Sequence, residues 1–253
     1  MSHSINPHVS FTVPSITQTL SAVPVSFQNQ FQGLEVYLDA GVTASYPGSG
    51  TTWFDISGNA RHVSLTSTSF SGDAGGTIVF SAGAQGIGAS MPWLSDSFTL
   101  SVWVRPTTVD STVRRFVTMQ AGADRSFSNW AVSRLDGANG FEQYHGFINT
   151  SNGVATSVRN NSQVKANQYQ NFVTTYSGSA QQVRTWKNNV LLGTASAGTP
   201  GILDSTLTNN NMIISSSGEP LLGNMYIVAL YNRAMSDLEL TRLYNYFRSR
   251  FGL

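Results

Sequence analysis

Residues 98–106 decide the fold, and they read Phe98-Thr99-Leu100-Ser101-Val102-Trp103-Val104-Arg105-Pro106. Every second residue from Phe98 to Val104 is apolar, and Thr, Ser, Trp and Arg stand between them. This period of two is typical of a β-strand, in which successive side chains point to opposite faces of a sheet. We therefore expect a strand here with one face in a hydrophobic core.

Similar short runs lie on both sides of this strand. We expect further strands at residues 34–38, 76–81, 114–120, 128–135, 140–149, 170–177, 181–187, 190–196, 211–216 and 223–231. Turn signals separate many of them, namely Asp136-Gly137, Asn139-Gly140, Asn152-Gly153, Ser177-Gly178 and Asn188-Asn189. Many short strands without a repeat period predict an all-β sandwich or barrel and disfavour a propeller.

The composition narrows the class of protein further. The chain has 253 residues, which suits one large sandwich, and no cysteine, which excludes disulfides and thiolate sites. Charged residues make up 11% of the chain, against about 25% in an average domain. The net charge of +1 argues against nucleic-acid binding, which needs clustered Lys and Arg.

The chain shows no signal for export or for a membrane. The start, residues 1–7, has neither a basic region nor an apolar run. The longest apolar run, residues 225–231, is far shorter than the roughly 20 residues of a membrane span. We therefore expect a soluble protein, made without a secretory signal and not inserted into a membrane.

Residues 1–32 differ from the rest because they contain no Asp, Glu, Lys or Arg. Short alternating runs are broken by three prolines. Two interpretations stay open: a terminal strand that packs on its own sandwich, or an arm that adds a strand to a neighbouring subunit. The apolar residues of such an assembly arm are Val9, Phe11, Val13 and Phe27. We divide the chain into this arm and a domain at 33–253.

One α-helix is expected near the C-terminus. Ser236 and Glu239 form the Ser-x-x-Glu pattern of a capping box. The apolar residues that follow share one helical face: Leu240, Leu243, Tyr244, Phe247 and Phe251. Gly252 is a plausible stop. We expect this helix to cap an open end or edge of the sandwich.

Several stretches, taken in order, resemble the laminin-G-like branch of the concanavalin A-like lectin and glucanase superfamily. They are residues 33–41 followed by 45–59, with Thr52-Trp53-Phe54-Asp55-Ile56-Ser57-Gly58-Asn59, then 98–106 and 231–239, and more weakly 172–178 with 186–193. The resemblance implies two stacked antiparallel sheets in a jelly roll. It does not imply one function, because this fold serves sugar binders, hydrolases, adhesion modules and virus structural proteins.

The chain departs from the family where many relatives have acids near a calcium or ligand site. Ser81-Ala82-Gly83-Ala84 follows the strand that ends at Phe80, and Ile227 stands where an acid is common in the last strand. Calcium needs several oxygen ligands, usually carboxylates. The resemblance allows a calcium ion, but these substitutions disfavour it, so we expect no cofactor.

The acids and histidines form no catalytic or metal-binding pattern. The Glu-x-Asp-x-x-Glu run of the superfamily's glucanases is missing, and Asp39, Asp55, Asp136 and Asp204 lie beside turn residues, so we read them as turn or cap residues. His3, His8, His62 and His145 show no spacing typical of metal ligands. On a strand, Glu142 and His145 face opposite sides. We therefore expect no enzyme activity and no metal site.

Some aromatic residues could stack on sugar rings: Trp93, Trp130, Tyr144 and Trp186. In a β-sandwich, however, aromatic residues more often fill the core. The best candidate is Trp130, because Asn129 and Arg134 are nearby and the loop at 122–125 precedes it. The candidate glycan-binding residues are Asn129, Trp130, Arg134 and Tyr144.

Two functions remain open. The first is a virion structural protein, such as a capsid decoration or minor capsid protein, that forms a homo-oligomer and contacts other capsid proteins through its arm. The second is a lectin-like module that binds cell-surface glycans. A glycoside hydrolase relative is a distant third. The virion hypothesis also predicts localisation in the virus particle, after synthesis in the host cytoplasm.

Overall fold

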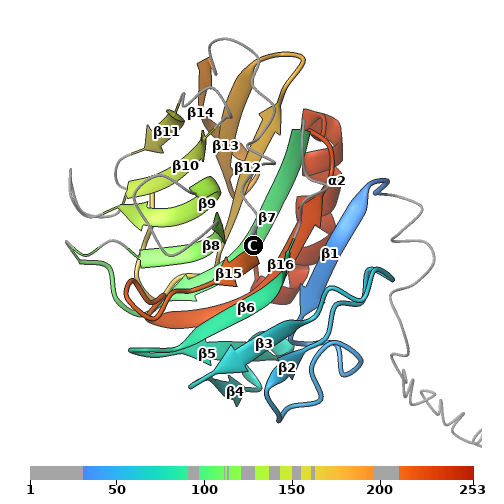
Figure 1. The fold of residues 1–253 in the computed structure, drawn as a ribbon, viewed down its shortest axis with the longest axis vertical. Helices are drawn as coiled ribbons and strands as arrows, with labels where there is room; N and C mark the ends of the chain where they lie inside the picture. Colours follow the sequence, from blue (N-terminus) through green and yellow to red (C-terminus); the bar gives the residue numbers. More distant parts are fainter. Residues whose placement is uncertain are drawn as a thin grey trace, which may run out of the picture.

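The computed structural model describes residues 31–90, 97–110, 112, 114–120, 129–136, 143–149, 155–160, 163–196 and 211–253. For residues 90, 119–120, 129–136, 143–149 and 155–160 it describes the backbone only. The strands form two sheets in which every pairing is antiparallel. The expected two-sheet jelly-roll architecture is confirmed (Figure 1).

The first sheet contains, in spatial order, β14 (Val190–Ser196), β13 (Gln182–Lys187), β12 (Gln170–Ser177), β7 (Ser97–Pro106), β16 (Gly223–Tyr231), β5 (Thr77–Phe80) and β4 (Ser69–Ser71). β1 (Leu34–Asp39) pairs with the second half of β16, beyond the residues that pair with β5. The strand predicted from residues 98–106 is β7, and it lies in the middle of this sheet.

The second sheet contains, in spatial order, β11 (Ala155–Asn160), β10 (Gln143–Asn149), β9 (Asn129–Asp136), β8 (Arg114–Gln120), β15 (Asn211–Ile214), β6 (Gln85–Ser90), β3 (Val63–Thr66) and β2 (Thr52–Trp53). Several of these strands were not expected from the sequence, namely β2, β3, β6 and β11. They are short or rich in Gly, Ser and Thr, so their apolar alternation is weak.

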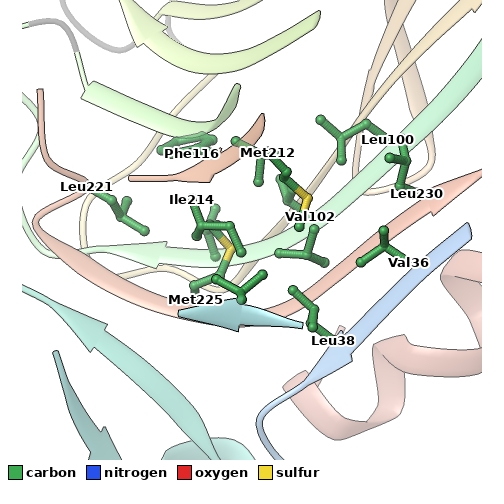
Figure 2. Packing of buried hydrophobic residues seen from close by; sticks show 14 of the residues in the cluster. Val36, Leu38, Leu100, Val102, Phe116, Met212, Ile214, Leu221, Met225 and Leu230 are labelled. Carbon is green, nitrogen blue, oxygen red and sulfur yellow. The ribbon is translucent and has the colours of Figure 1, made fainter. Parts of the chain in front are cut away.

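The main hydrophobic core lies between the two sheets (Figure 2). β7 contributes Leu100 and Val102 to it, and β8 contributes Phe116. These side chains are at most 1% exposed. Burying each such side chain contributes about 1.5–3 kcal/mol to folding. The apolar half of the alternation at 98–104 therefore faces this core, as the sequence predicts.

A second core lies on the other face of the first sheet, under helix α2 (Asp237–Phe247) and the 3-10 turn η2 (Arg248–Phe251). α2 supplies Leu240, Leu243 and Phe247 to this cluster. In Figure 1 the helix lies alongside β1, β16 and β7, away from β8–β11. The expectation that the helix caps an open end or edge was wrong, because it covers a sheet face.

The second core explains the polar half of the β7 alternation. Thr99 and Trp103 are at most 1% exposed, and Ser101 is 2% exposed. Thr99 Oγ1 donates to the carbonyl oxygen of Arg233 and accepts from the backbone N–H of Met235, just before the helix. Thr99 and Ser101, which accepts from Asn171, are therefore buried and hydrogen-bonded instead of solvated.

A β-bulge in β16 enlarges this second core. Met225 pairs with Val104 and Ile227 pairs with Trp103, so Tyr226 is an extra residue in the ladder. Met225 belongs to the core between the sheets, whereas Tyr226 and Ile227 both belong to the helix-covered core. The bulge thus turns two successive side chains toward the helix.

None of the helices in the described part of the chain combines the length and apolar character needed to span a bilayer. The arm residues Val9, Phe11, Val13 and Phe27 lie outside the described residues.

Candidate functional site

The sequence-predicted glycan residues lie on two neighbouring strands of the second sheet. Asn129, Trp130 and Arg134 are on β9, and Tyr144 is on β10. Arg134 stands opposite His145 in the ladder, and Tyr144 stands opposite Leu135. The structure therefore places the four residues within one pair of strands, while their side chains lie outside what it describes. The glycan site stays a prediction.

Trp130 occupies an irregular position in β9. Met119 of β8 pairs with Ala131, and the next residue, Gln120, pairs with Asn129. Trp130 is therefore an extra residue without a Cα partner on β8, which is the arrangement of a β-bulge. Bulges bend a strand, interrupt its ladder and occur often beside functional sites.

A second bulge lies on β8, the neighbour of β9 in the same sheet. Arg115 pairs with Arg134 and Val117 pairs with Ser133, so Phe116 is the extra residue. Phe116 and Val117 both belong to the core between the sheets. Of the two flanking residues, Thr118 follows Val117 directly and so lies on the opposite face. Arg115 pairs with Arg134, the neighbour of the Ser133 that pairs with Val117, so it lies on that opposite face too. The two flanking residues therefore lie on the face of the second sheet that is turned away from this core.

Arg115 is 3% exposed and pairs through Nε with the carboxylate of Glu219. Its backbone N–H also donates to the carbonyl oxygen of Glu219 at 3.0 Å. Nη1 of Arg115 and Oγ1 of Thr118 are buried without a hydrogen-bond partner in the described part of the chain. A buried donor without a partner costs about 1–3 kcal/mol of folding free energy. The stability of the fold therefore does not explain why these two polar groups stand here.

Sequence reasoning did not select Arg115. The available signal was the Arg114-Arg115 pair inside a predicted strand of a charge-poor chain. Arg114 forms an ion pair with Asp110 at 2.5 Å. The register between β8 and β9, which places Arg115 opposite Arg134, could not be predicted from the sequence.

A separate aromatic group lies at the β2–β4 end of the sandwich. Phe54 is 38% exposed, and its ring packs edge-on against the His62 ring with 5.2 Å between the ring centroids. Asp55 holds this loop by accepting from the backbone N–H groups of Tyr37 and Ser57 at 2.8 and 2.9 Å. Asp55 is therefore a turn residue, as expected.

Asp39 is also a turn residue, with a further role. Its Oδ1 accepts from the backbone N–H of Gly41 at 2.8 Å and pairs with Nη1 of Arg250 at 2.5 Å. Asp136 ends β9, and its side chain is not described; Asp204 lies outside the described residues. Among the described residues, no group of three or more His, Asp or Glu could hold a metal ion.

The two remaining aromatic candidates for sugar stacking are Trp186 and Trp93. Trp186 is 4% exposed and belongs to the helix-covered core, so it fills a core. Trp93 lies outside the described residues. Ile227, which stands where relatives often have an acid, is fully buried in the same core under the helix.

A polar cluster ties the 3-10 turn η1 (Asp73–Gly75) to the first sheet. Asp73 accepts from Tyr226 at 2.6 Å, from Tyr169 at 2.7 Å and from Arg105 at 3.1 Å. Burial opposes the charged carboxylate, but these hydrogen bonds outweigh it and lower the pKa of Asp73 below its ordinary 3.8. Burial and the Asp73 carboxylate raise the pKa of Tyr226 well above its ordinary value. The donors of Tyr226, Tyr169 and Arg105 and the carboxylate of Asp73 are hydrogen-bonded to one another, so the cluster stabilises the fold.

The family assignment follows from the sequence and the fold together. The family described as the concanavalin A-like lectin/glucanases superfamily, Laminin_G_3, matches residues 57–241, which is more than half of the chain. The chain belongs to this superfamily. No curated protein is similar enough in sequence to count as a match.

Solved structures with the same fold include binding domains of toxins and a sialidase. The binding domain of Paraclostridial Mosquitocidal Protein 1 has a TM-score of 0.64 at 14% identity, covering 85% of this chain and 52% of that chain. The botulinum neurotoxin serotype D ligand binding domain, crystallised in complex with N-acetylneuraminic acid, has a TM-score of 0.63 at 9% identity, covering 84% and 50%. Trypanosoma rangeli sialidase has a TM-score of 0.59 at 14% identity, covering 88% and 33%.

This superfamily member thus spans about half the length of the toxin domains that it matches. At these identities the similarity establishes a shared fold.

Proposed function

We propose that this chain is a non-enzymatic lectin-like module that binds glycans on the β8–β10 part of its second sheet. The observation that supports this most directly is the pair of bulges on the neighbouring strands β8 and β9, at Phe116 and Trp130. The bulge at Phe116 lies next to a buried arginine, Arg115, whose Nη1 has no hydrogen-bond partner among the described residues. A sheet site with polar groups beside an aromatic residue suits a sugar, which offers hydroxyls and an apolar ring face.

The similarity to known proteins also supports a binding role. Two of the structures with this fold are binding domains, and one of them was crystallised with N-acetylneuraminic acid. The sialidase with the same fold is an enzyme, but the acids of this sequence lack the paired pattern of the superfamily's glucanases.

A glycan array of the full chain tests this proposal, with Trp130→Ala as the variant. We expect binding to a defined set of glycans and its loss in Trp130→Ala. The matched control is Phe54→Ala, which removes an exposed aromatic ring at the other end of the second sheet and should leave binding intact. No signal on a broad array, or equal binding by wild type and Trp130→Ala, would contradict the proposal.

A second candidate, compatible with the first, is that the chain is a virion component that assembles through its N-terminal arm. The supporting observation is the anchor from which this arm starts. Phe31 is 1% exposed and packs edge-on against Tyr231 at 6.5 Å, and Arg233 donates to the carbonyl oxygen of Gln32 at 2.8 Å. We propose that Val9, Phe11, Val13 and Phe27 contact a neighbouring subunit or capsid protein.

Light scattering at several concentrations tests the arm. The truncated chain should start at Phe31, because a start at Gly33 would remove a core side chain. We expect a defined oligomer for the full chain and a monomer for the truncation. Monomers in both cases would argue against assembly through the arm.

A further inference from the structure

Four basic residues lie in one transverse row of the second sheet. Arg115 of β8 pairs with Arg134 of β9, Arg134 pairs with His145 of β10, and His145 pairs with Arg159 of β11. Directly paired residues are neighbours on one face of an antiparallel sheet. The row therefore crosses four adjacent strands on the face that Arg115 occupies, which is turned away from the core between the sheets.

Such a row is unfavourable for folding by itself. Like charges directly opposite each other destabilise a sheet, by up to about 1 kcal/mol a pair. The whole chain has only 14 Lys and Arg among 253 residues, yet three arginines share this row. Glu219 pairs with Arg115 at one end, and Asp136 follows Arg134 by two positions on β9. Among the described residues, the three arginines of the row outnumber these two acids, which favours an anion as the ligand.

The buried end of the row indicates a place for an acceptor. Glu219 occupies Nε of Arg115, while Nη1 is buried and has no partner among the described residues. An arginine fork binds a carboxylate through two parallel N–H groups, and it does so better than a lysine.

We propose that the row Arg115, Arg134, His145 and Arg159 binds the carboxylate of an acidic glycan. This inference rests on the proposed glycan-binding function and adds the chemical class of the ligand. The three arginines attract the negative charge, and Trp130, on the same strand as Arg134, contacts the sugar ring. A neutral sugar adds no negative charge to the row and binds more weakly.

Calorimetry with 3′-sialyllactose and with lactose tests this inference on the full chain. A charge-assisted bidentate pair contributes about 1.5–3 kcal/mol, which is roughly a 10- to 100-fold change in Kd. We therefore expect wild type to bind 3′-sialyllactose at least roughly tenfold more tightly than lactose. Arg134→Gln and Arg159→Gln should remove this preference, and Arg134→Lys should keep part of it.

The matched control is Arg242→Gln, which removes the same charge from an exposed position on α2. It should bind 3′-sialyllactose as wild type does. Arg159 lies on the edge strand β11, so its variant should keep the wild-type melting temperature even if Arg134→Gln does not.

The outcomes separate the two proposals. Equal binding of the two sugars, or an unchanged preference in Arg159→Gln, would overturn the basic row and leave glycan binding standing. A preference that is lost equally in Arg242→Gln would also overturn it, because net charge alone would then explain the binding. A glycan array without any signal would overturn the glycan function itself.

Discussion

Trp103 lies between two aromatic rings in the helix-covered core. Its ring stacks on the ring of Phe251, with 4.4 Å between ring centroids, and on the ring of Tyr244, with 5.6 Å between centroids. The indole Nε1 is buried without a hydrogen-bond partner in the described part of the chain. The residue therefore stabilises the fold through its apolar surface, and its one polar atom works against that stabilisation.

We predict that Trp103→Ala lowers the free energy of unfolding by about 3–5 kcal/mol, because it removes a large buried ring. Trp103→Phe should cost much less, because it keeps a ring and removes the unpaired N–H. Urea unfolding followed by circular dichroism measures both variants. A loss below 1 kcal/mol in the alanine variant would contradict the packing described for α2.

Asp73 is the second residue whose environment gives a direct prediction. Asp73→Asn keeps the shape of the side chain and removes the charge that accepts from Tyr226, Tyr169 and Arg105. We expect a loss of about 1.5–3 kcal/mol at pH 7, the usual contribution of a hydrogen bond to a charged group.

The loss should depend on pH in a defined direction. The pKa of Asp73 is lower in the folded chain than its ordinary 3.8. Its contribution is therefore present above that value and disappears as the pH falls through the folded pKa. A difference between wild type and Asp73→Asn that stays constant from pH 7 to pH 2 would contradict this.

At the scale of elements, the start of helix α2 is held by a capping box and an ion pair. The Ser236 side chain accepts from the backbone N–H of Glu239, and Glu239 accepts from the backbone N–H of Ser236 at 2.9 Å. Arg233 donates to both carboxylate oxygens of Glu239, at 3.0 and 2.7 Å. The helix start is thereby joined to the end of β16.

We predict that Ser236→Ala lowers the free energy of unfolding by about 0.5–2 kcal/mol, the usual cost of losing an N-cap. Ser249→Ala, an exposed change just after the same helix, is the matched control and should have little effect. Equal melting temperatures for wild type and Ser236→Ala would show that the cap is not needed.

The sequence predicted some features of helix α2 and of the second sheet but not others. The capping box and the apolar face of α2 were predictable because local spacing determines both. The position of the helix was not, since Thr99, Ser101 and Trp103 look like a solvated strand face until the helix covers them. Likewise, Arg134 was selected from its neighbours in sequence, but its pairing with Arg115 and His145 depends on register across three strands.

At the scale of the whole molecule, ion pairs join segments far apart in the sequence. Arg250 near the C-terminus binds Asp39 of β1, and Arg184 of β13 binds Asp237 of α2. Hydrogen bonds from Arg184 lower the pKa of Asp237, and those from Arg114 lower the pKa of Asp110. The Arg233 guanidinium lowers the pKa of Glu239 from 4.5 to about 2.

We predict acid destabilisation of the whole chain over the range that these carboxylates define. Asp110, Asp237 and Glu239 have a lower pKa in the folded state. The contribution of each is therefore complete above its unfolded pKa and is lost as the pH falls through its folded pKa. For Glu239 that range is from 4.5 to about 2. Urea unfolding at pH 7, 4.5 and 2.5 measures the effect, and Glu239→Gln should show a weaker pH dependence. Equal stability at all three values would contradict the ion pairs.

The central claim is that the β8–β10 part of the second sheet, with Arg159 of β11 beside it, binds a glycan. Its most direct test is a titration of the isotope-labelled full chain with 3′-sialyllactose, followed by amide chemical shifts. We predict that the shifts concentrate at residues 114–120, 129–136, 143–149 and 155–160, which form these four strands. Shifts concentrated instead in the loops around Phe54 and His62, or no shifts at saturating sugar, would contradict the claim.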